Sequence, residues 1–441
     1  MYRKALSHSL SKLGFGLISK VVSTGTSKAP LSTRCRANKA LINFTLAGCV
    51  LGLSACAAPP KTGAELAQSL LIIDTHIDVP YRLKLSYADV SRATESGDFD
   101  YPRAIDGGLN APFMSIYIPA KVDEAGGAFA LADELIDGME SLAESAPDKF
   151  AIATCSDDLQ SHFENNLISL PLGMENGGPV TQSEEALRHF FNRGIRYITL
   201  AHSKSNKISD SSYDTNEAWM GLSPYGKELI TRMNNLGVMI DVSHISDAAF
   251  DQVIEISKAP VIASHSSLRH YTPGFARNMS DEMVKTLGAA QGVIQINFGS
   301  NFLTETAQIY SKQRREMVMA YIASEGLAQD DPAVKAFAEQ YKKDNPYPYA
   351  TIEDVLNHID RVVALAGIDS VGIGSDYDGV GDSLPQGLKD VSTYPNLIEG
   401  LLGRGYSEAD IAKVLGGNAL RVWQAVEAYA ASQGTAQQCR D

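Results

Sequence analysis

The chain has 441 residues, of which 20% are charged and 44% hydrophobic, an ordinary balance for a soluble globular protein. Its formal net charge is −14, but residues 1–55 hold eight Lys or Arg and no Asp or Glu, so the remainder carries −22 (−14 minus 8). A surface this acidic argues against nucleic-acid binding, which needs clustered basic side chains.

The N-terminal segment has the order of an export signal. Basic residues extend to Lys39, and residues 40–53 form an apolar run that is too short to span a bilayer, which takes about 20 residues. The run ends in Leu53-Ser54-Ala55-Cys56, which resembles a bacterial lipobox. That resemblance implies that residues 1–55 are a lipoprotein signal segment, that Cys56 carries the lipid, and that residues 56–65 are a tether. The alternative is ordinary cleavage with Cys56 incidental.

A lipoprotein of this kind is exported and anchored to the membrane through its N-terminal lipid, on the periplasmic or cell-surface side. Besides Cys56, only Cys155 and Cys439 remain after processing. An oxidising compartment permits a bond between these two cysteines, and the sequence leaves their pairing open.

Beyond the tether, short apolar runs rich in β-formers alternate with amphipathic helical patterns. The predicted strands are 70–75, 112–118, 169–174, 195–201, 238–243, 260–264, 292–298 and 370–375. The predicted helices include 128–145, 183–193, 224–236, 246–257, 280–290 and 353–366. Eight strand–helix units predict an α/β fold, a (β/α)8 TIM-type barrel. A doubly wound sheet is the alternative, but no glycine-rich phosphate loop follows the first strand.

The pattern predicts a single barrel domain over residues 66–430, followed by a tail over 431–441. Residues 303–350 are too long for a simple strand–helix connection, and they are charged and helix-prone. We therefore expect an insertion over or beside the barrel mouth. The segment from residue 395 onward is expected to form closing helices.

Side chains able to bind a metal stand at the ends of the predicted strands. They are His76, His202, His244, His265, Glu175 and Asp376. Because all strands of such a barrel end on the face that carries active sites, these side chains are expected to converge. The two-residue spacing of His76 and Asp78 places both on one face of a strand, and imidazole with carboxylate suits zinc.

Each of these residues also has a simpler explanation. Glu175, after a buried apolar run, either bridges two metal ions or forms a salt bridge. A single strand-end histidine is explained by a hydrogen bond in the core, but His244 and His265 follow neighbouring strands. With His76, Asp78 and Glu175 they complete a two-metal site if Glu175 is shared. Asp376 is then placed to act as a general base and His202 as an electrophile.

The motifs around these residues resemble the membrane dipeptidases, also called renal or microsomal dipeptidases, of peptidase family M19. The most specific pieces are IDTHIDVP, LGMENG, YITLAHS, DVSHISD and GIGSDYDG, in the family's order. The resemblance implies a barrel of the metal-dependent hydrolase superfamily that holds two zinc ions. His76 and Asp78 look like ligands of the first ion and His244 and His265 like ligands of the second, with Glu175 as the bridge.

The resemblance also implies the reaction, which is hydrolysis of the peptide bond of dipeptides by a hydroxide that bridges the metals. His202 matches the residue that contacts the scissile carbonyl, Arg277 the residue that holds the substrate, and Asp376 the residue that moves the proton. A homodimer is implied as well. Gly299 departs from the family, which often has Tyr there, and the 303–350 insertion is not typical of the animal enzymes.

Two other functions stay open at this point. Another barrel amidohydrolase, such as a lactonase-like enzyme, commonly bridges its metals with a modified lysine, and Lys204 lies near the required place. His202 occupies the strand end there, however, and Glu175 already supplies a bridge. A metal-free binding lipoprotein with the same barrel is the second alternative, because a fold alone does not prove a function.

Overall fold

The computed structural model describes residues 61–435 of the chain. The predicted signal segment, Cys56 and Cys439 lie outside these residues. Within residues 61–435, no helix is both long and apolar enough to cross a membrane.

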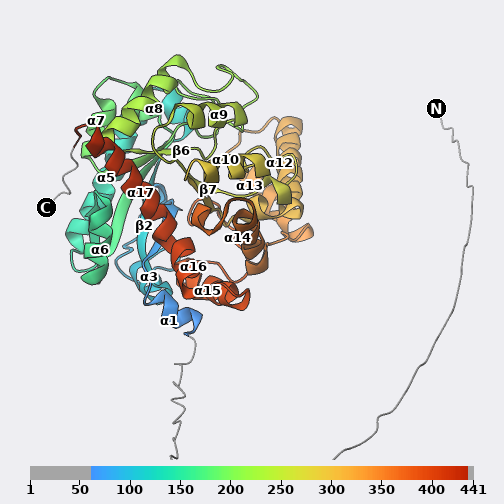
Figure 1. Ribbon diagram of the computed structural model, residues 1–441. Helices are drawn as coiled ribbons and strands as arrows, with labels where there is room; N and C mark the ends of the chain where they lie inside the picture. The colour runs from blue at the N-terminus through green and yellow to red at the C-terminus, as the bar shows by residue number, and fades with distance from the viewer. Residues whose placement is uncertain (1–60, 436–441) are drawn as a thin grey trace, which may run out of the picture. The chain divides into compact units, whose positions relative to one another are not determined.

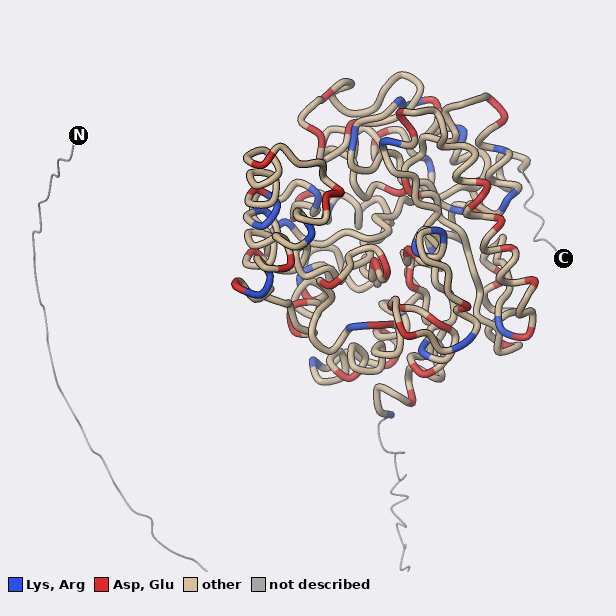
Figure 2. Tube along the Cα trace, turned by 180° about the vertical axis from the view of Figure 1, so that it is seen from behind, with Lys and Arg blue, Asp and Glu red and all other residues tan. Residues whose placement is uncertain are grey.

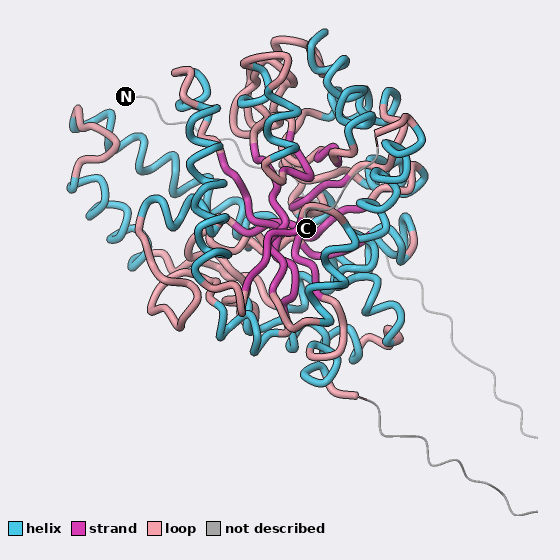
Figure 3. Tube along the Cα trace, turned by 90° about the vertical axis from the view of Figure 1, so that its left-hand side faces the viewer, coloured by secondary structure: helices cyan, strands magenta, loops and turns pink. Residues whose placement is uncertain are grey.

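Eight parallel strands form a barrel in the order β1-β2-β4-β5-β6-β7-β8-β9. Their bounds are β1 Ile72–Ile77, β2 Leu109–Tyr117, β4 Ile168–Glu175, β5 Ile195–Thr199, β6 Met239–Asp241, β7 Ile262–Ser266, β8 Val293–Ile296 and β9 Val371–Ile373. Figure 3 shows the strands gathered at the centre inside a surround of helices. The first and last strands meet where Ile77 bridges Tyr377 in parallel and Asp376 N donates to His76 O at 3.0 Å. The predicted TIM-type barrel is confirmed.

One strand was missed from the sequence. β3, Phe150–Ala153, pairs with β4 outside the barrel order. Its four residues FAIA are too short a run to stand out by periodicity. By contrast, every residue of β1 and β4 is buried, and strands covered on both faces show as nearly continuous apolar runs.

The predicted helices are confirmed to within a few residues. They are α5 Ala128–Ser145, α7 Ala186–Asn192, α8 Pro224–Leu236, α9 Asp247–Ile256, α10 Asp281–Ala289 and α14 Ile352–Ala366. Serine side chains explain three of the starts, because Ser223, Ser246 and Ser280 each accept a hydrogen bond from a backbone N–H of the first helical turn. Gly237 ends α8 in the left-handed conformation that glycine adopts without strain.

The opposite end of the barrel from the predicted site is sealed. The closing helices include α15 Tyr394–Gly403, α16 Glu408–Ala412 and α17 Asn418–Ser432, and Figure 1 shows α17 lying across the strands. On α17, the Trp423 ring packs 5.4 Å from that of Phe113, which in turn lies 5.4 Å from Tyr197 in the barrel. These side chains belong to a separate apolar cluster. The barrel interior is therefore accessible only from the end where the C-termini of the strands lie.

The insertion is a pair of helices, α12 Glu305–Glu325 and α13 Pro332–Asp344. The rings of Tyr321 and Phe337 stack between them with centroids 4.3 Å apart. Figure 2 shows basic and acidic positions interspersed along this pair. Only Ala307 on α12 and Val334 on α13 are buried, so the pair stands mostly in solvent beside the barrel.

The remaining helices are short. They are α1 Gly63–Ala67, α2 Val79–Leu85, α3 Tyr101–Gly107, α4 Ala120–Glu124, α6 Ser156–Glu164 and α11 Ser300–Leu303. α1 starts within the segment that the sequence assigns to the tether, and Gly63 N donates to Glu399 Oε2 of α15 at 2.8 Å. Residues 61–65 thus pack on the barrel domain. At the start of α6, Cys155 is disulfide-bonded.

Candidate active site

The predicted site residues meet at one end of the barrel. His76 is the last residue but one of β1, Asp78 precedes α2, Glu175 ends β4, His202 follows β5, His244 follows β6, His265 lies in β7, and Asp376 follows β9. His244 and Asp376 have positive φ values of 70° and 64°. Side chains other than glycine adopt this backbone conformation sparingly, and such residues cluster at functional sites. The turns after β6 and β9 are thus strained where they carry candidate site residues.

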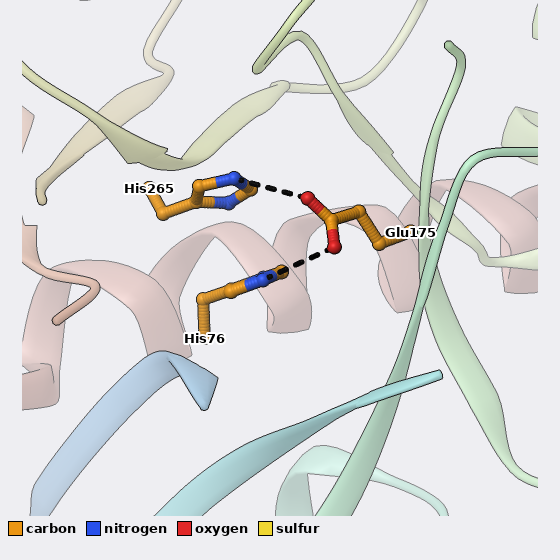
Figure 4. A group of neighbouring side chains, drawn as sticks. All are labelled: His76, Glu175 and His265. Carbon is orange, nitrogen blue, oxygen red and sulfur yellow. Dashed lines mark ion pairs between the residues drawn. The ribbon is translucent and has the colours of Figure 1, made fainter. Parts of the chain in front are cut away.

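Glu175 is the centre of the cluster. Its Oε1 lies 3.1 Å from Nε2 of His244 and 3.3 Å from Nε2 of His265. Its Oε2 lies 3.6 Å from Nε2 of His76, and Figure 4 shows the carboxylate between the rings of His76 and His265. Nε2 of His202 also lies 3.5 Å from Oε1. The two oxygens therefore face two different sets of ligands, as a bridging carboxylate requires.

Two aspartates, Asp78 and Asp376, lie on the His76 side of the cluster. Oδ2 of Asp78 lies 3.5 Å from Nε2 of His76. Asn297 donates from Nδ2 to Oδ2 of Asp376 at 2.7 Å. A Cβ on Gly379 would stand 2.1 Å from Asp78 Oδ2 and 2.2 Å from Asp376 Oδ1. Only glycine at position 379 leaves room for both carboxylates.

These separations fit divalent metals better than hydrogen bonds. Two ligands at about 2.1 Å from one tetrahedral ion lie about 3.4 Å apart, close to the 3.5 and 3.6 Å around His76 Nε2. That buried nitrogen has no hydrogen-bond partner among the described residues, and neither has Asp78 Oδ1. Buried polar atoms are rarely left without partners. Three residue groups are compact enough to hold an ion: His76, Glu175 and His265; Glu175, His202 and His244; and His76, Asp78 and Asp376.

The charges of the cluster suit metal binding as well. Burial raises the pKa of Glu175, but the charges of His202 and His76 and the contacts with His244 and His265 outweigh it, so its pKa lies well below the ordinary value. Glu175 is thus a carboxylate at neutral pH. Burial is the main cause that holds the pKa values of His244 and His265 well below 6.5. Positive charge adds to it, chiefly from Arg277 at His244 and from His76 at His265. Neutral imidazoles are the form that binds metals.

Two further pKa shifts distinguish the carboxylate-rich side. Burial lowers the pKa of His76, but Tyr197, Glu175 and Asp78 raise it well above the ordinary value. This side of the cluster attracts positive charge, either a proton or a metal ion. Burial, followed by the charge of Asp78, raises the pKa of Asp376 well above its usual range.

Buried hydroxyls that the sequence analysis did not single out orient the histidines. The Tyr197 hydroxyl lies 2.8 Å from His76 Nδ1. Ser264 donates from Oγ to Asp241 Oδ2 at 2.7 Å. The same oxygen lies 2.8 Å from Nδ1 of His265 and therefore accepts a hydrogen bond from Nδ1–H. That arrangement leaves Nε2 of His265 as a bare lone pair facing Glu175. In the sequence, Ser264 could have been noticed only because it precedes His265, and Tyr197 only because it lies in a strand of the barrel.

A cavity of about 820 Å³ opens over the cluster. Its lining includes Asp78, Glu175, His202, His244 and Asp376, together with Tyr117, Tyr213, Phe302 and Arg315. The edge of the Tyr117 ring packs on His202 with centroids 4.9 Å apart. Arg315 comes from the inserted helix α12, so the insertion does reach the mouth of the site.

Arg277 lies behind the cavity wall rather than along it. Its Nη1 donates to Ser266 Oγ at 2.8 Å and its Nη2 to the backbone oxygen of His265 at 2.7 Å. Its buried Nε has no partner among the described residues, and the guanidinium lies over the Phe302 ring at 5.5 Å. Because each terminal nitrogen carries a second N–H, donors of Arg277 remain for a ligand.

Gly299 has little room for the tyrosine that the family often carries there. A Cβ on Gly299 would stand 2.8 Å from the Phe302 ring and 2.9 Å from Val380. Both of these side chains line the cavity. Phe302 therefore occupies space next to the position of the missing side chain.

Sequence comparison points to one family. The sequence model of the membrane dipeptidases (peptidase family M19) matches residues 61–437. Dipeptidase tcpJ of Claviceps purpurea is 31% identical over 345 residues, which cover 77% of this chain and 71% of that protein. An uncharacterized dipeptidase of Schizosaccharomyces pombe is 30% identical over 388 residues, with 83% of each chain covered.

Solved structures agree with this assignment. The probable dipeptidase PvdM of Pseudomonas aeruginosa superposes with a TM-score of 0.71 at 30% identity, over 83% of this chain and 98% of that one. A metallo peptidase of Rhodobacter sphaeroides, liganded with a phosphinate mimic of the dipeptide L-Ala-D-Ala, has a TM-score of 0.66 at 23% identity, over 81% and 99% of the two chains, and supports the fold. On the extent of these matches, the chain belongs to the membrane dipeptidase family of metallopeptidases, peptidase family M19.

Proposed function

We propose that this protein is a zinc-dependent dipeptidase of the membrane dipeptidase type. The observation that carries the proposal is the position of Glu175, whose two oxygens face His244 and His265 on one side and His76 on the other. The donor set of imidazoles and carboxylates suits zinc. In this proposal His76 and Asp78 hold one ion, His244 and His265 hold the other, and Glu175 bridges both.

The bound ions would supply the acidity that makes hydroxide available near neutral pH. The protein's own groups then handle the substrate and its protons. Asp376, placed by its bond from Asn297, accepts a proton from the attacking water and delivers it to the leaving amine. His202, whose side chain reaches the cavity, stabilises the negative charge that develops on the carbonyl oxygen.

Arg277 limits the length of the substrate in this proposal. Its unpaired Nε and remaining terminal N–H groups would hold the substrate's α-carboxylate. Arg277 is bonded to the backbone of His265, so a carboxylate that it holds would lie next to the candidate metal ligands, which favours dipeptides over longer chains. The lactonase-like alternative is disfavoured because Lys204 pairs with Asp214 at 3.4 Å and Glu175 occupies the bridging position.

The decisive experiment measures metal and activity on one preparation. We expect about two zinc ions per chain, turnover of L,L or L,D dipeptides, and loss of both after chelation and dialysis. Restoring zinc should restore the turnover. A folded protein that binds no metal and still binds peptides would instead support the metal-free binding lipoprotein.

We further propose that the protein is exported, that Cys56 anchors it to the membrane by its lipid, and that it works as a homodimer. The lipobox resemblance at Cys56 supports the anchor, and family membership supports the dimer. Light scattering of the detergent-solubilised protein tests the oligomeric state.

A further inference from the structure

The insertion brings to the catalytic cavity a cation that no carboxylate of residues 61–435 pairs with. Three lysine or arginine side chains line this cavity. Arg82 pairs with Asp378 at 2.7 Å and Lys204 with Asp214 at 3.4 Å. Arg315 lines the same cavity and is exposed, and its charge remains available to a ligand.

The helix that carries Arg315 is fixed to the barrel. Five residues before Arg315, the Tyr310 ring packs edge-on against Tyr347 with centroids 5.1 Å apart, and Tyr347 packs 4.9 Å from Tyr349. The Tyr349 hydroxyl donates to Asp382 Oδ1 at 2.7 Å, in the loop after β9. These contacts hold the first turns of α12 against the loop after β9.

Arg315 and Arg277 act on the same wall of the cavity. The Phe302 ring and Arg315 line the same cavity, and the guanidinium of Arg277 lies 5.5 Å from the centroid of the Phe302 ring. Arg277 is buried behind the wall, whereas Arg315 stands on the open side. A substrate in the cavity therefore meets Arg315 in the lining and Arg277 next to Phe302.

We propose that Arg315 binds a second carboxylate on the substrate, so that the enzyme prefers dipeptides with Asp or Glu at the C-terminal position. This inference rests on the proposed function, in which Arg277 takes the α-carboxylate. The side chain of that same residue is the group that we expect Arg315 to contact. A planar guanidinium holds a carboxylate through two parallel N–H donors, which an amide of the same shape cannot match.

The test compares kcat/KM for L-Ala-L-Glu and L-Ala-L-Gln, which differ in charge but hardly in size. The wild type should prefer the acidic peptide, and Arg315→Met should reduce the ratio of the two values about tenfold. The matched control is Lys312→Met, on the same helix but outside the cavity lining, which should keep the wild-type ratio. Arg315→Glu should shift the preference toward L-Ala-L-Lys.

An unchanged ratio in Arg315→Met would overturn the proposal. So would an Arg315-dependent preference for L-Glu-L-Ala over L-Gln-L-Ala that equals or exceeds the preference at the C-terminal position. If the zinc-loaded wild type cleaves no dipeptide at all, the proposed function itself fails. If it cleaves L-Ala-L-Gln but Arg315 has no influence on selectivity, only the role of Arg315 fails.

Discussion

The Nε2 atoms of His244 and His265 lie 2.8 Å apart, although His244 follows β6 and His265 lies in β7. Ser264 Oγ accepts a hydrogen bond from Nδ1–H of His265, so Nε2 of that ring is a lone pair aimed at its neighbour. Without a cation, a proton on His244 must fill the space between the nitrogens. A metal ion held with Glu175 would take the place of this proton, which on the neutral His244 ring then sits on Nδ1.

Glu175→Gln tests the bridge. The amide keeps the size of the side chain but replaces one anionic oxygen with a donor, which cannot bind an ion. We expect one zinc ion or fewer per chain and loss of most dipeptidase activity, measured by elemental analysis and turnover. Glu255→Gln, on an exposed position of α9, is the matched control and should behave as the wild type. Two ions and full activity in Glu175→Gln would rule out the bridging role.

Asp376→Asn tests proton transfer. Since Asp376 is not assigned as a zinc ligand, zinc content should stay near normal. General acid–base groups contribute about 10²–10⁴-fold, so kcat should fall at least about a hundredfold with little change in substrate affinity. A variant that instead lost thermal stability and kept its rate at low temperature would show that Asp376 only braces the loop after β9.

Tyr197→Phe tests how the first metal ligand is oriented. The substitution keeps the buried ring but removes the hydroxyl that lies 2.8 Å from His76 Nδ1. Groups of this kind typically contribute about 10–100-fold to metal affinity, so zinc should bind at least about tenfold more weakly, with turnover recovering at high zinc. Tyr271→Phe removes a hydroxyl bound to Asn357 O away from the cluster and serves as control. Equal zinc affinity in both variants would contradict the orienting role.

Asp98 gives a pH dependence of stability. Burial, followed by the charge of Asp378, raises the pKa of Asp98 to about 6. The folded protein therefore holds this proton more tightly than the unfolded chain, and the carboxyl opposes folding increasingly as pH rises from about 4 to about 6. Above that range, Asp98→Asn should increase the free energy of unfolding by on the order of 2 kcal/mol.

Urea unfolding of both proteins between pH 4 and 8 measures this difference. Asp106→Asn, on an exposed position, is the control and should follow the wild type. A difference between Asp98→Asn and wild type that does not grow with pH would refute the prediction.

Cys56→Ser tests the anchor. The substitution should release the protein from membranes without changing its turnover, because Cys56 precedes the barrel domain. Bacterial lipoproteins carry several acyl chains, so the wild type should be held firmly. Fractionation followed by a dipeptidase assay measures both properties. A wild type found wholly in the soluble fraction would show that the lipobox prediction is wrong.

The sequence predicted the barrel because its strands are covered on both faces and read as apolar runs. It also predicted that His76, Glu175, His244 and His265 meet, since strand ends of a barrel share one face. It could not predict the partners of these residues. In the sequence, Tyr197 and Ser264 look like ordinary core residues. Only the folded barrel shows that the Tyr197 hydroxyl contacts His76 and that the Ser264 hydroxyl contacts His265. The place of Arg315 depends on how an inserted helix pair folds back, which no local pattern encodes.

The barrel closes only when β9, the last strand, pairs with β1, the first strand. Ser375 N donates to Asp74 Oδ1 across a separation of 301 residues, and the first strand has no second neighbour until the last one has been made. Pairing over such a distance is entropically costly and slow. A chain truncated before β9 would keep two open sheet edges, which are templates for aggregation. Late closure thus slows the folding of the whole barrel, and it makes every truncated product a candidate for proteolysis.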